Sequence, residues 1–333
     1  MREAMFIKKN VDKWNEYQQQ ETGNPDETAE RFITLVDDLS YSKTFYPHSH
    51  ATRWINGITA GIYQKIYKNR KEKYTRIITF WKYDLPFLFK KYHKVFLFSF
   101  ILFFLFALIG WFSAQHNDNF IRLILGDDYV NLTDDNIAKG DPLGIYRESN
   151  MFSAFVLIGV HNTAIAFAMF LSGLTLSILN IFLVFSNGLE IGVFQYMFFA
   201  KGLGWQSVVV VWIHGVMEIS SFIIASTAGF IISNSILFPQ TYSRFVSFKR
   251  GMKDACKIMI TLIPMFFIAS FFEAYITQLM SNTIDTDSKT IGMPIWAGIL
   301  ILIFFLSFIT WYFIIYPIRL HKKGYQPNSG ILK

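Results

Sequence analysis

Four ionisable side chains lie inside long apolar stretches of the sequence: Glu190, His214, Glu218 and Glu273. An ionisable group in hydrocarbon is costly, so such residues are retained where they pair with one another or serve a function. His214 and Glu218 are four residues apart and therefore share one face of a helix. Together with Asn162, which we expect at a similar depth, His214, Glu218 and Glu273 form the predicted intramembrane polar cluster.

Two interpretations of this cluster are open at the level of sequence. It is either a hydrogen-bonded network that fixes helix packing or a site for a proton, an ion or a ligand. The segment His214-Gly-Val-Met-Glu218 differs from the His-Glu-x-x-His motif of zinc proteases, in which two histidines hold the metal. The sequence also has no nucleotide-binding loop, dinucleotide fingerprint or nucleophile signature. We therefore predict no metal, no cofactor and no catalytic residue, and a protein that is not an enzyme.

The helix face that carries His214 and Glu218 continues with small side chains at Ser221, Ala225 and Gly229. Small residues let neighbouring helices approach closely, so this face is expected to contact protein rather than lipid. Two positions are alternatives for the turn between the second and third spans, Gly173 and the Asn187-Gly188 pair. The full set of residues predicted for helix packing or turns is Gly173, Asn187, Gly188, Gly215, Ala225 and Gly229.

The composition indicates a membrane protein. The chain of 333 residues is 52% hydrophobic, contains 36 phenylalanines and has a mean hydropathy of +0.31. Its apolar residues form runs of about 20, the length of a transmembrane helix. We therefore predict an all-α, polytopic protein that contacts membrane lipid. The net charge of +7 comes from Lys and Arg beside the apolar runs, which indicates topology rather than nucleic-acid binding. Cys256 is the only cysteine, so an intrachain disulfide is excluded.

Six spans are expected, with both termini on the cytoplasmic side of an inner or cytoplasmic membrane. Between residues 65 and 94 the sequence has ten Lys or Arg against two acids, which is typical of cytoplasmic flanks. Residues 115–150 hold seven acids and form the predicted external loop. The predicted transmembrane domain, residues 93–320, precedes a basic tail at 321–333 and contains spans near 95–114, 152–173, 177–200, 207–237, 258–280 and 294–316.

Residues 1–92 are expected to form a cytosolic region of amphipathic helices. The segment 24–27, Asn-Pro-Asp-Glu, has a capping residue, an early proline and acids in the first turn, as helix starts do. Further along, apolar residues such as Ile55, Ile58 and Ile62 recur at helical spacing. The region is either a small helical bundle or a surface on which a partner docks.

Several of these residues carry a resemblance to a known family. The chain resembles the signature of the stage II sporulation protein M family in His214-Gly-Val-Met-Glu218-Ile-Ser-Ser running into Ala228-Gly229, Phe272-Glu273-Ala-Tyr-Ile-Thr277, Asn187-Gly188 followed by Gly192, the apolar run after Asn162, and Pro239 before the basic Arg244. It departs from the pattern in having His161 where many members have a second asparagine, and Gln240 rather than glycine after the proline.

The N-terminal segments 1–10 and 37–47 are similar to the extended N-terminal region of Bacteroidetes-type members from non-sporulating lineages. The resemblance implies a membrane anchor, because in spore formers the family member belongs to an engulfment complex with peptidoglycan-degrading partners. Such a role concerns partners rather than chemistry, in agreement with the lack of a catalytic motif.

Two functions are compatible with these features. The first is a non-enzymatic membrane scaffold, acting as a homodimer, that recruits envelope or peptidoglycan-remodelling partners. The alternative is a transporter or permease component whose site is the intramembrane cluster of Asn, His and Glu. The glycines at 173 and 188 fit the alternative, since broken helices often line transport sites.

Overall fold

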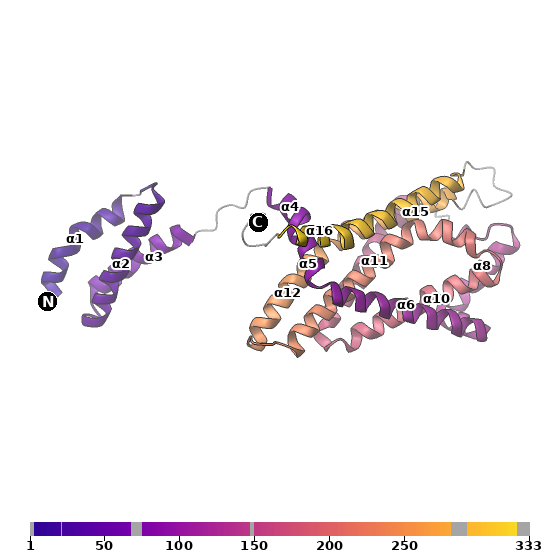
Figure 1. Cartoon of the computed structure of the whole chain (residues 1–333), viewed down its shortest axis with the longest axis horizontal. Coiled ribbons are helices and arrows are strands. Elements are labelled where there is room, and N and C mark those ends of the chain that lie inside the picture. The colour runs from indigo at the N-terminus through magenta and orange to yellow at the C-terminus, as the bar shows by residue number, and fades with distance from the viewer. Residues whose placement is uncertain (1–2, 21, 68–74, 147–149, 281–291, 325–333) are drawn as a thin grey trace. The chain divides into compact units, whose positions relative to one another are not determined.

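The computed structural model describes residues 3–20, 22–67, 75–146, 150–280 and 292–324. Within these ranges the chain is helical apart from short turns and contains no β-strand, which confirms the predicted all-α class (Figure 1). The predicted basic tail lies outside the described residues from 325 onward. The chain divides into two compact units, Met1–Arg76 and Ile77–Lys333, and each is described by itself.

The N-terminal unit has a core of its own. Its three helices are α1 (Glu3–Gln19), α2 (Pro25–Phe45) and α3 (His50–Tyr67). Asn24 caps α2 by accepting a hydrogen bond of 3.0 Å from the backbone N–H of Asp26. Trp14 is fully buried, and its indole N–H donates to the Asp38 carboxylate over 2.8 Å. The other buried residues of this apolar cluster are Phe6, Leu35, Ile55, Ile58 and Ile62.

The second unit contains the apolar helices. Within the described residues, six helical stretches are long and apolar enough to cross a membrane: His93–His116, Met151–Thr175, Ile178–Ala200, Gly204–Leu237, Arg244–Met280 and Ile295–Lys322. The elements of these stretches are α6 (His93–His116), α9 (Met151–Leu171), α10 (Ile178–Ala200), α11 (Gly204–Leu237), α12 (Arg244–Ile260), α13 (Leu262–Phe271), η4 (Phe272–Thr277), α15 (Ile295–Ile309), η5 (Thr310–Ile315) and α16 (Tyr316–Lys322). Three short helices precede them: α4 (Thr75–Thr79), η1 (Phe80–Asp84) and α5 (Leu85–Lys91).

The central helix of this unit is α11. In the most apolar 18-residue stretch of α11, 67% of the residues are buried. The corresponding share is 17% for α6 and 11% for the last span. Helices α6, α9, α10, α12, α13 and α15 all pack on α11. At 1.5 Å per residue its 34 residues extend for about 51 Å, beyond a hydrocarbon core of roughly 30 Å. The outward faces of α6 and α15 instead carry exposed apolar side chains such as Phe98, Leu105 and Phe304, which suit contact with lipid.

Glycines allow α6 and α10 to lie against each other. A Cβ atom at Gly192 would collide with the carbonyl oxygen of Ala107, and one at Gly188 would come within 2.8 Å of another carbonyl oxygen of α6. From the opposite side, a Cβ at Gly110 would lie against the backbone of Leu189. The two helices therefore meet backbone to backbone, as small residues permit in membranes. Gly188 belongs to this interface and lies inside α10.

The turn between the second and third spans lies at residues 172–177. A 3-10 turn, η3 (Ser172–Thr175), follows α9, and Leu176 and Ser177 then adopt positive φ angles of 54° and 73°. Of the two predicted positions, the structure therefore places the turn at Gly173. A Cβ at Gly173 would collide with the carbonyl oxygen of Gly229 in α11, so this glycine permits the turn to pack closely on the central helix.

The predicted external loop is folded against the ends of the spans. It contains α7 (Asp118–Leu125), α8 (Asp127–Ala138) and a 3-10 turn, η2 (Gly144–Tyr146). Ile121, Val130 and Leu143 are buried here together with apolar residues of α10 and α11. Lys201, which follows α10, pairs with Asp134 of α8. We call this side of the membrane unit the acidic end.

The opposite side carries the basic flanks, and we call it the basic end. Asp254 of α12 accepts a hydrogen bond of 2.8 Å from the hydroxyl of Tyr92 and pairs with Lys91 over 2.6 Å. Burial raises the pKa of Tyr92 to about 12, so its hydroxyl is a donor throughout the physiological pH range. The contact ties α12 to the start of α6.

Two glycine substitutions test the packing of the membrane unit. Gly192→Ala should lower the free energy of unfolding by about 1–3 kcal/mol, because the methyl group overpacks the α6–α10 interface. Gly215→Ala is the matched control, since no atom lies within 4 Å of the added Cβ and alanine is the better helix former. Thermal unfolding of the purified protein in detergent measures both. Equal losses in the two variants would contradict this account of the interface.

Candidate functional site

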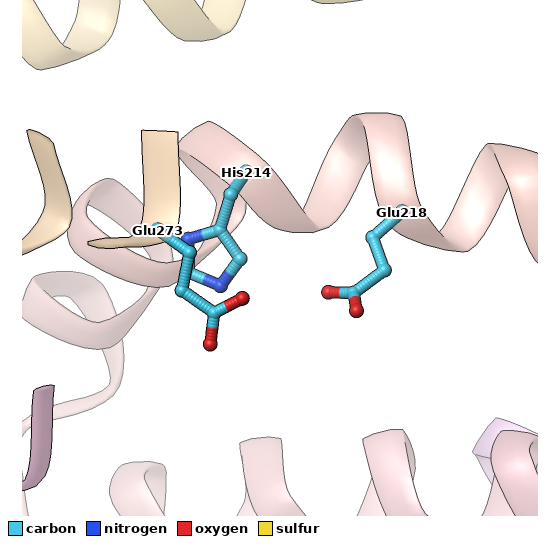
Figure 2. Close-up of side chains that lie close together, drawn as sticks. All are labelled: His214, Glu218 and Glu273. Carbon is cyan, nitrogen blue, oxygen red and sulfur yellow. The ribbon is translucent and has the colours of Figure 1, made fainter. Parts of the chain in front are cut away.

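Three ionisable side chains from two spans point into one space beside α11. His214 and Glu218 lie one turn apart on α11, and Glu273 reaches them from η4 (Figure 2). One candidate ligand atom from each side chain lies within 4.8 Å of the other two. His214 is only 3% exposed, whereas Glu218 and Glu273 are partly accessible. The structure thus brings together three of the four residues of the predicted cluster.

The imidazole of His214 is oriented by Thr277, a buried residue of η4. The Thr277 hydroxyl donates to the carbonyl oxygen of Phe272 over 3.2 Å, and its oxygen lies 2.9 Å from His214 Nδ1. Either atom of this pair can be the donor, because the hydroxyl rotates and the tautomer of His214 decides whether Nδ1 donates or accepts. The other ring nitrogen, Nε2, faces the side on which the carboxylates lie (Figure 2). In the tautomer in which Thr277 accepts from Nδ1, Nε2 of the neutral imidazole carries the lone pair.

Asn162 of α9 is the fourth residue of the predicted cluster. It is 6% exposed, and its side-chain amide donates a hydrogen bond to the Glu218 carboxylate. It is the twelfth residue of α9, so at 1.5 Å per residue it lies about 16 Å from the end at Met151. This depth is close to the middle of the hydrocarbon core. The bond therefore joins α9 to α11 at this depth.

Two further ionisable residues, His161 of α9 and Glu190 of α10, adjoin this cluster. Both are exposed, although they lie within candidate spans. Glu190 is close enough to interact electrostatically with His161 and with Glu218. Helices α9 and α10 each pack on α11 far more than on one another. We define the polar seam as the set His161, Asn162, Glu190, His214, Glu218 and Glu273.

The polar seam approaches the acidic end through Tyr129 of α8. Burial, and to a lesser degree the negative charge of nearby Glu190, raises the pKa of Tyr129 to about 12. The phenol is therefore neutral at physiological pH. A protonated phenol close to the exposed carboxylate links the folded acidic end to the seam.

Comparison with protein families decides the assignment of the chain. A family model described as Stage II sporulation protein M matches residues 99–278, which is more than half of the 333 residues. The chain belongs to this family. With six candidate membrane-spanning helices in the described residues, this stage II sporulation protein M family member is a multi-pass membrane protein. A second model, a domain of unknown function (DUF8413), matches residues 4–68 and so coincides with the N-terminal unit. Comparisons with curated proteins and with solved structures gave no match.

The small and amide residues predicted for packing have separate roles in this family member. Ala225 is fully buried on α11, and a Cβ at Gly229 would come within 2.8 Å of the amide nitrogen of Asn180. Asn187 donates to the carbonyl oxygen of Leu183 in its own helix over 2.8 Å. Asn187 therefore contacts neither the turn nor the polar seam through this bond.

Gly215 provides room rather than close packing. The residue is buried, yet apart from its chain neighbours and the backbone of its own helix no heavy atom lies within 4 Å of the position that its Cβ would take. It directly follows His214 and precedes Glu218 by three residues, so the open space lies beside the seam. A side chain at this position would fill space next to both ionisable groups.

The contact of Thr277 with His214 was not predicted from the sequence, and neither was the position of Glu190 near the cluster. Thr277 is four residues after Glu273, a spacing that could have indicated a shared face. Its inward position also depends on η4, a π-helical segment, and such segments are frequent at functional sites. Glu190 was recognised as an intramembrane acid, but its proximity to the cluster depends on the position of the turn at 172–177.

Replacing the amide of Asn162 tests the hydrogen-bonded part of the seam. Asn162→Ala should lower the free energy of unfolding by about 1–3 kcal/mol, because a Glu218 oxygen loses a hydrogen-bond donor that comes from another span. The control is Asn187→Ala, which removes an amide that bonds only within its own helix. Thermal unfolding in detergent compares the two, and a smaller loss for Asn162→Ala than for the control would refute this role.

Proposed function

We propose that the protein is a component of a membrane transport system in which the polar seam takes up a cation. The observation that carries the proposal is the exposure of Glu190 and His161 within spans, next to the more buried groups of the same seam. The protein would reside in a bacterial inner membrane with both termini in the cytoplasm. Catalysis forms no part of this proposed role.

The physical reason lies in the cost of exposing ionisable groups to lipid. Ionisable residues within membrane spans face the protein interior or a water-filled cavity and mark ion or proton pathways. Glu190 is eleventh from the end of α10 at Ala200, so it lies about 15 Å from that end. Water reaching Glu190 and His161 would solvate them and would also give a cation access to Glu218.

The inner part of the seam favours a positively charged occupant. Candidate ligand atoms of His214, Glu218 and Glu273 lie within 4.8 Å of one another, and the Thr277 contact holds the imidazole in this position. Two carboxylates so close together repel each other when both are ionised, and a bound proton or metal cation relieves that repulsion. A group that gains and loses such an occupant can couple cation binding to helix movement.

A membrane scaffold that acts as a homodimer is the second candidate. The same exposed pair, His161 and Glu190, could be covered by a second copy of the chain instead of water. The N-terminal unit, a compact bundle with its own core, would then recruit envelope or peptidoglycan-remodelling proteins. In this case the function would survive Glu218→Gln and Glu273→Gln, because neither carboxylate would bind anything that the scaffold requires.

Cysteine accessibility separates the two candidates. The single native cysteine is first removed by Cys256→Ser, and Glu190→Cys is then treated in membranes with a charged, membrane-impermeant thiol reagent. We expect reaction about tenfold or more faster than for Val160→Cys, because only a hydrated thiol ionises readily. Val160 is a fair control, since it is 55% exposed on α9 beside His161 and is apolar.

Equally slow reaction of the two variants would refute water access to the seam and would favour the scaffold. In that event, crosslinking through Glu190→Cys should trap a dimer. If the thiol at position 190 reacts as expected, proteoliposomes containing a pH-sensitive dye show whether an imposed gradient drives proton movement. The same assay with Glu218→Gln measures how far that movement depends on the seam.

A further inference from the structure

We propose that His214, Glu218 and Glu273 bind a divalent first-row transition-metal cation such as Zn²⁺, Mn²⁺ or Fe²⁺. The inference rests on the proposed uptake of a cation and names the class of that cation. It goes beyond the sequence prediction, which assigned no metal, because it depends on the meeting of η4 with α11.

The separation of the three side chains suits one ion. Nitrogen and carboxylate ligands lie about 2.0–2.2 Å from Zn²⁺, so two ligands of one ion are at most about 4.4 Å apart. The candidate atoms of His214, Glu218 and Glu273 lie within 4.8 Å of one another. Small rotations of the two glutamate side chains therefore bring all three into bonding distance, with no change in the helices.

The donor set selects the kind of metal. One imidazole and two carboxylates suit zinc, manganese and iron, whereas Mg²⁺ and Ca²⁺ prefer oxygen ligands alone and Cu⁺ prefers sulfur. The charge of the ligands also favours a divalent metal cation. Two ionised carboxylates carry two negative charges, which a divalent cation balances and a single proton does not. An ion of this class would therefore hold both Glu218 and Glu273 in their ionised forms.

The surrounding residues supply what metal ligands require. A metal-bound histidine usually donates its other ring N–H to an oxygen, and the Thr277 oxygen stands 2.9 Å from His214 Nδ1. A ligating carboxylate is usually hydrogen-bonded as well, and Asn162 donates to Glu218. The two contacts come from different spans, so the ligands are oriented by the fold and not by their own helix alone.

The site also has room for exchange. Three protein ligands leave at least one position of a four-coordinate ion for water or another ligand. The space beside Gly215, where no heavy atom lies within 4 Å of a Cβ, adjoins His214 and Glu218. Glu190 and His161, the other ionisable groups of the seam, are exposed within candidate spans. Water around them, as the proposed function requires, would form the path by which an ion arrives. A free coordination position and a route to the site are features of a site that exchanges its metal ion, whereas a structural metal site has all its coordination positions filled by the protein.

Metal titration of the purified full-length protein tests the proposal. The protein is stripped with a chelator in detergent and titrated with Zn²⁺ and Mn²⁺ by calorimetry, and with Co²⁺ by visible absorption. We expect one ion per chain and visible bands typical of Co²⁺ with nitrogen and oxygen ligands. His214→Gln, Glu218→Gln and Glu273→Gln should each abolish the saturable binding. Asp128→Asn, which neutralises an exposed acid of α8, should leave it unchanged.

Thr277→Val provides a test that keeps all three ligands. It removes only the oxygen that orients His214, and it should weaken binding by about 10- to 100-fold. Size-exclusion chromatography checks that each variant is folded. A wild-type protein that binds none of the three metals, or binding that persists in all three ligand variants, would overturn the proposal. Thiol access at position 190 is measured without added metal. A failure to bind metal would therefore overturn the metal site without deciding whether water reaches the seam.

Discussion

The arrangement of the membrane unit depends on the cost of exposing ionisable side chains to hydrocarbon. His214 and Glu218 occupy the helix that is most enclosed by its neighbours, and Glu273 and Asn162 reach them from adjacent spans. Close packing around α11 makes this enclosure possible, because glycines at the turn after α9 and on α11 itself let backbones touch. The polar groups and the small residues are thus related. The polar side chains require burial between helices, and the small residues allow the helices to pack closely enough to bury them.

The sequence predicted the membrane class, the number of spans and the family from local features. Runs of about 20 apolar residues mark the spans regardless of how the spans pack. The four-residue spacing of His214 and Glu218 likewise fixes a shared face in any helix. The turn between the second and third spans could not be chosen, because glycine favours both turns and close helix contacts. Gly173 and Gly188 carry the same local signal and differ only in what lies opposite them.

Contacts between different spans could not be predicted from sequence patterns. Glu190 lies on α10, which packs mainly on α6 and α11 and little on α9, and no local spacing encodes which helices become neighbours. The contact between Thr277 and His214 joins residues 63 positions apart. The N-terminal unit was more accessible to prediction, since the capping box-like start at Asn24 and the apolar spacing of α3 are local features. Its core, centred on Trp14, again depended on packing.

The π-helical segment η4 has a consequence for comparing this chain with its relatives. A π-turn closes its hydrogen bonds over five residues instead of four, so it is equivalent to one residue inserted into an α-helix. Each residue of an α-helix rotates the face by about 100°. A relative that lacks the extra residue would keep a span of nearly the same length and hydropathy, yet Glu273 and the residues after it would point in different directions. A single gap in an alignment at 272–277 would therefore distinguish two kinds of family member. One kind would share the polar seam, and the other would share only the arrangement of the helices around it.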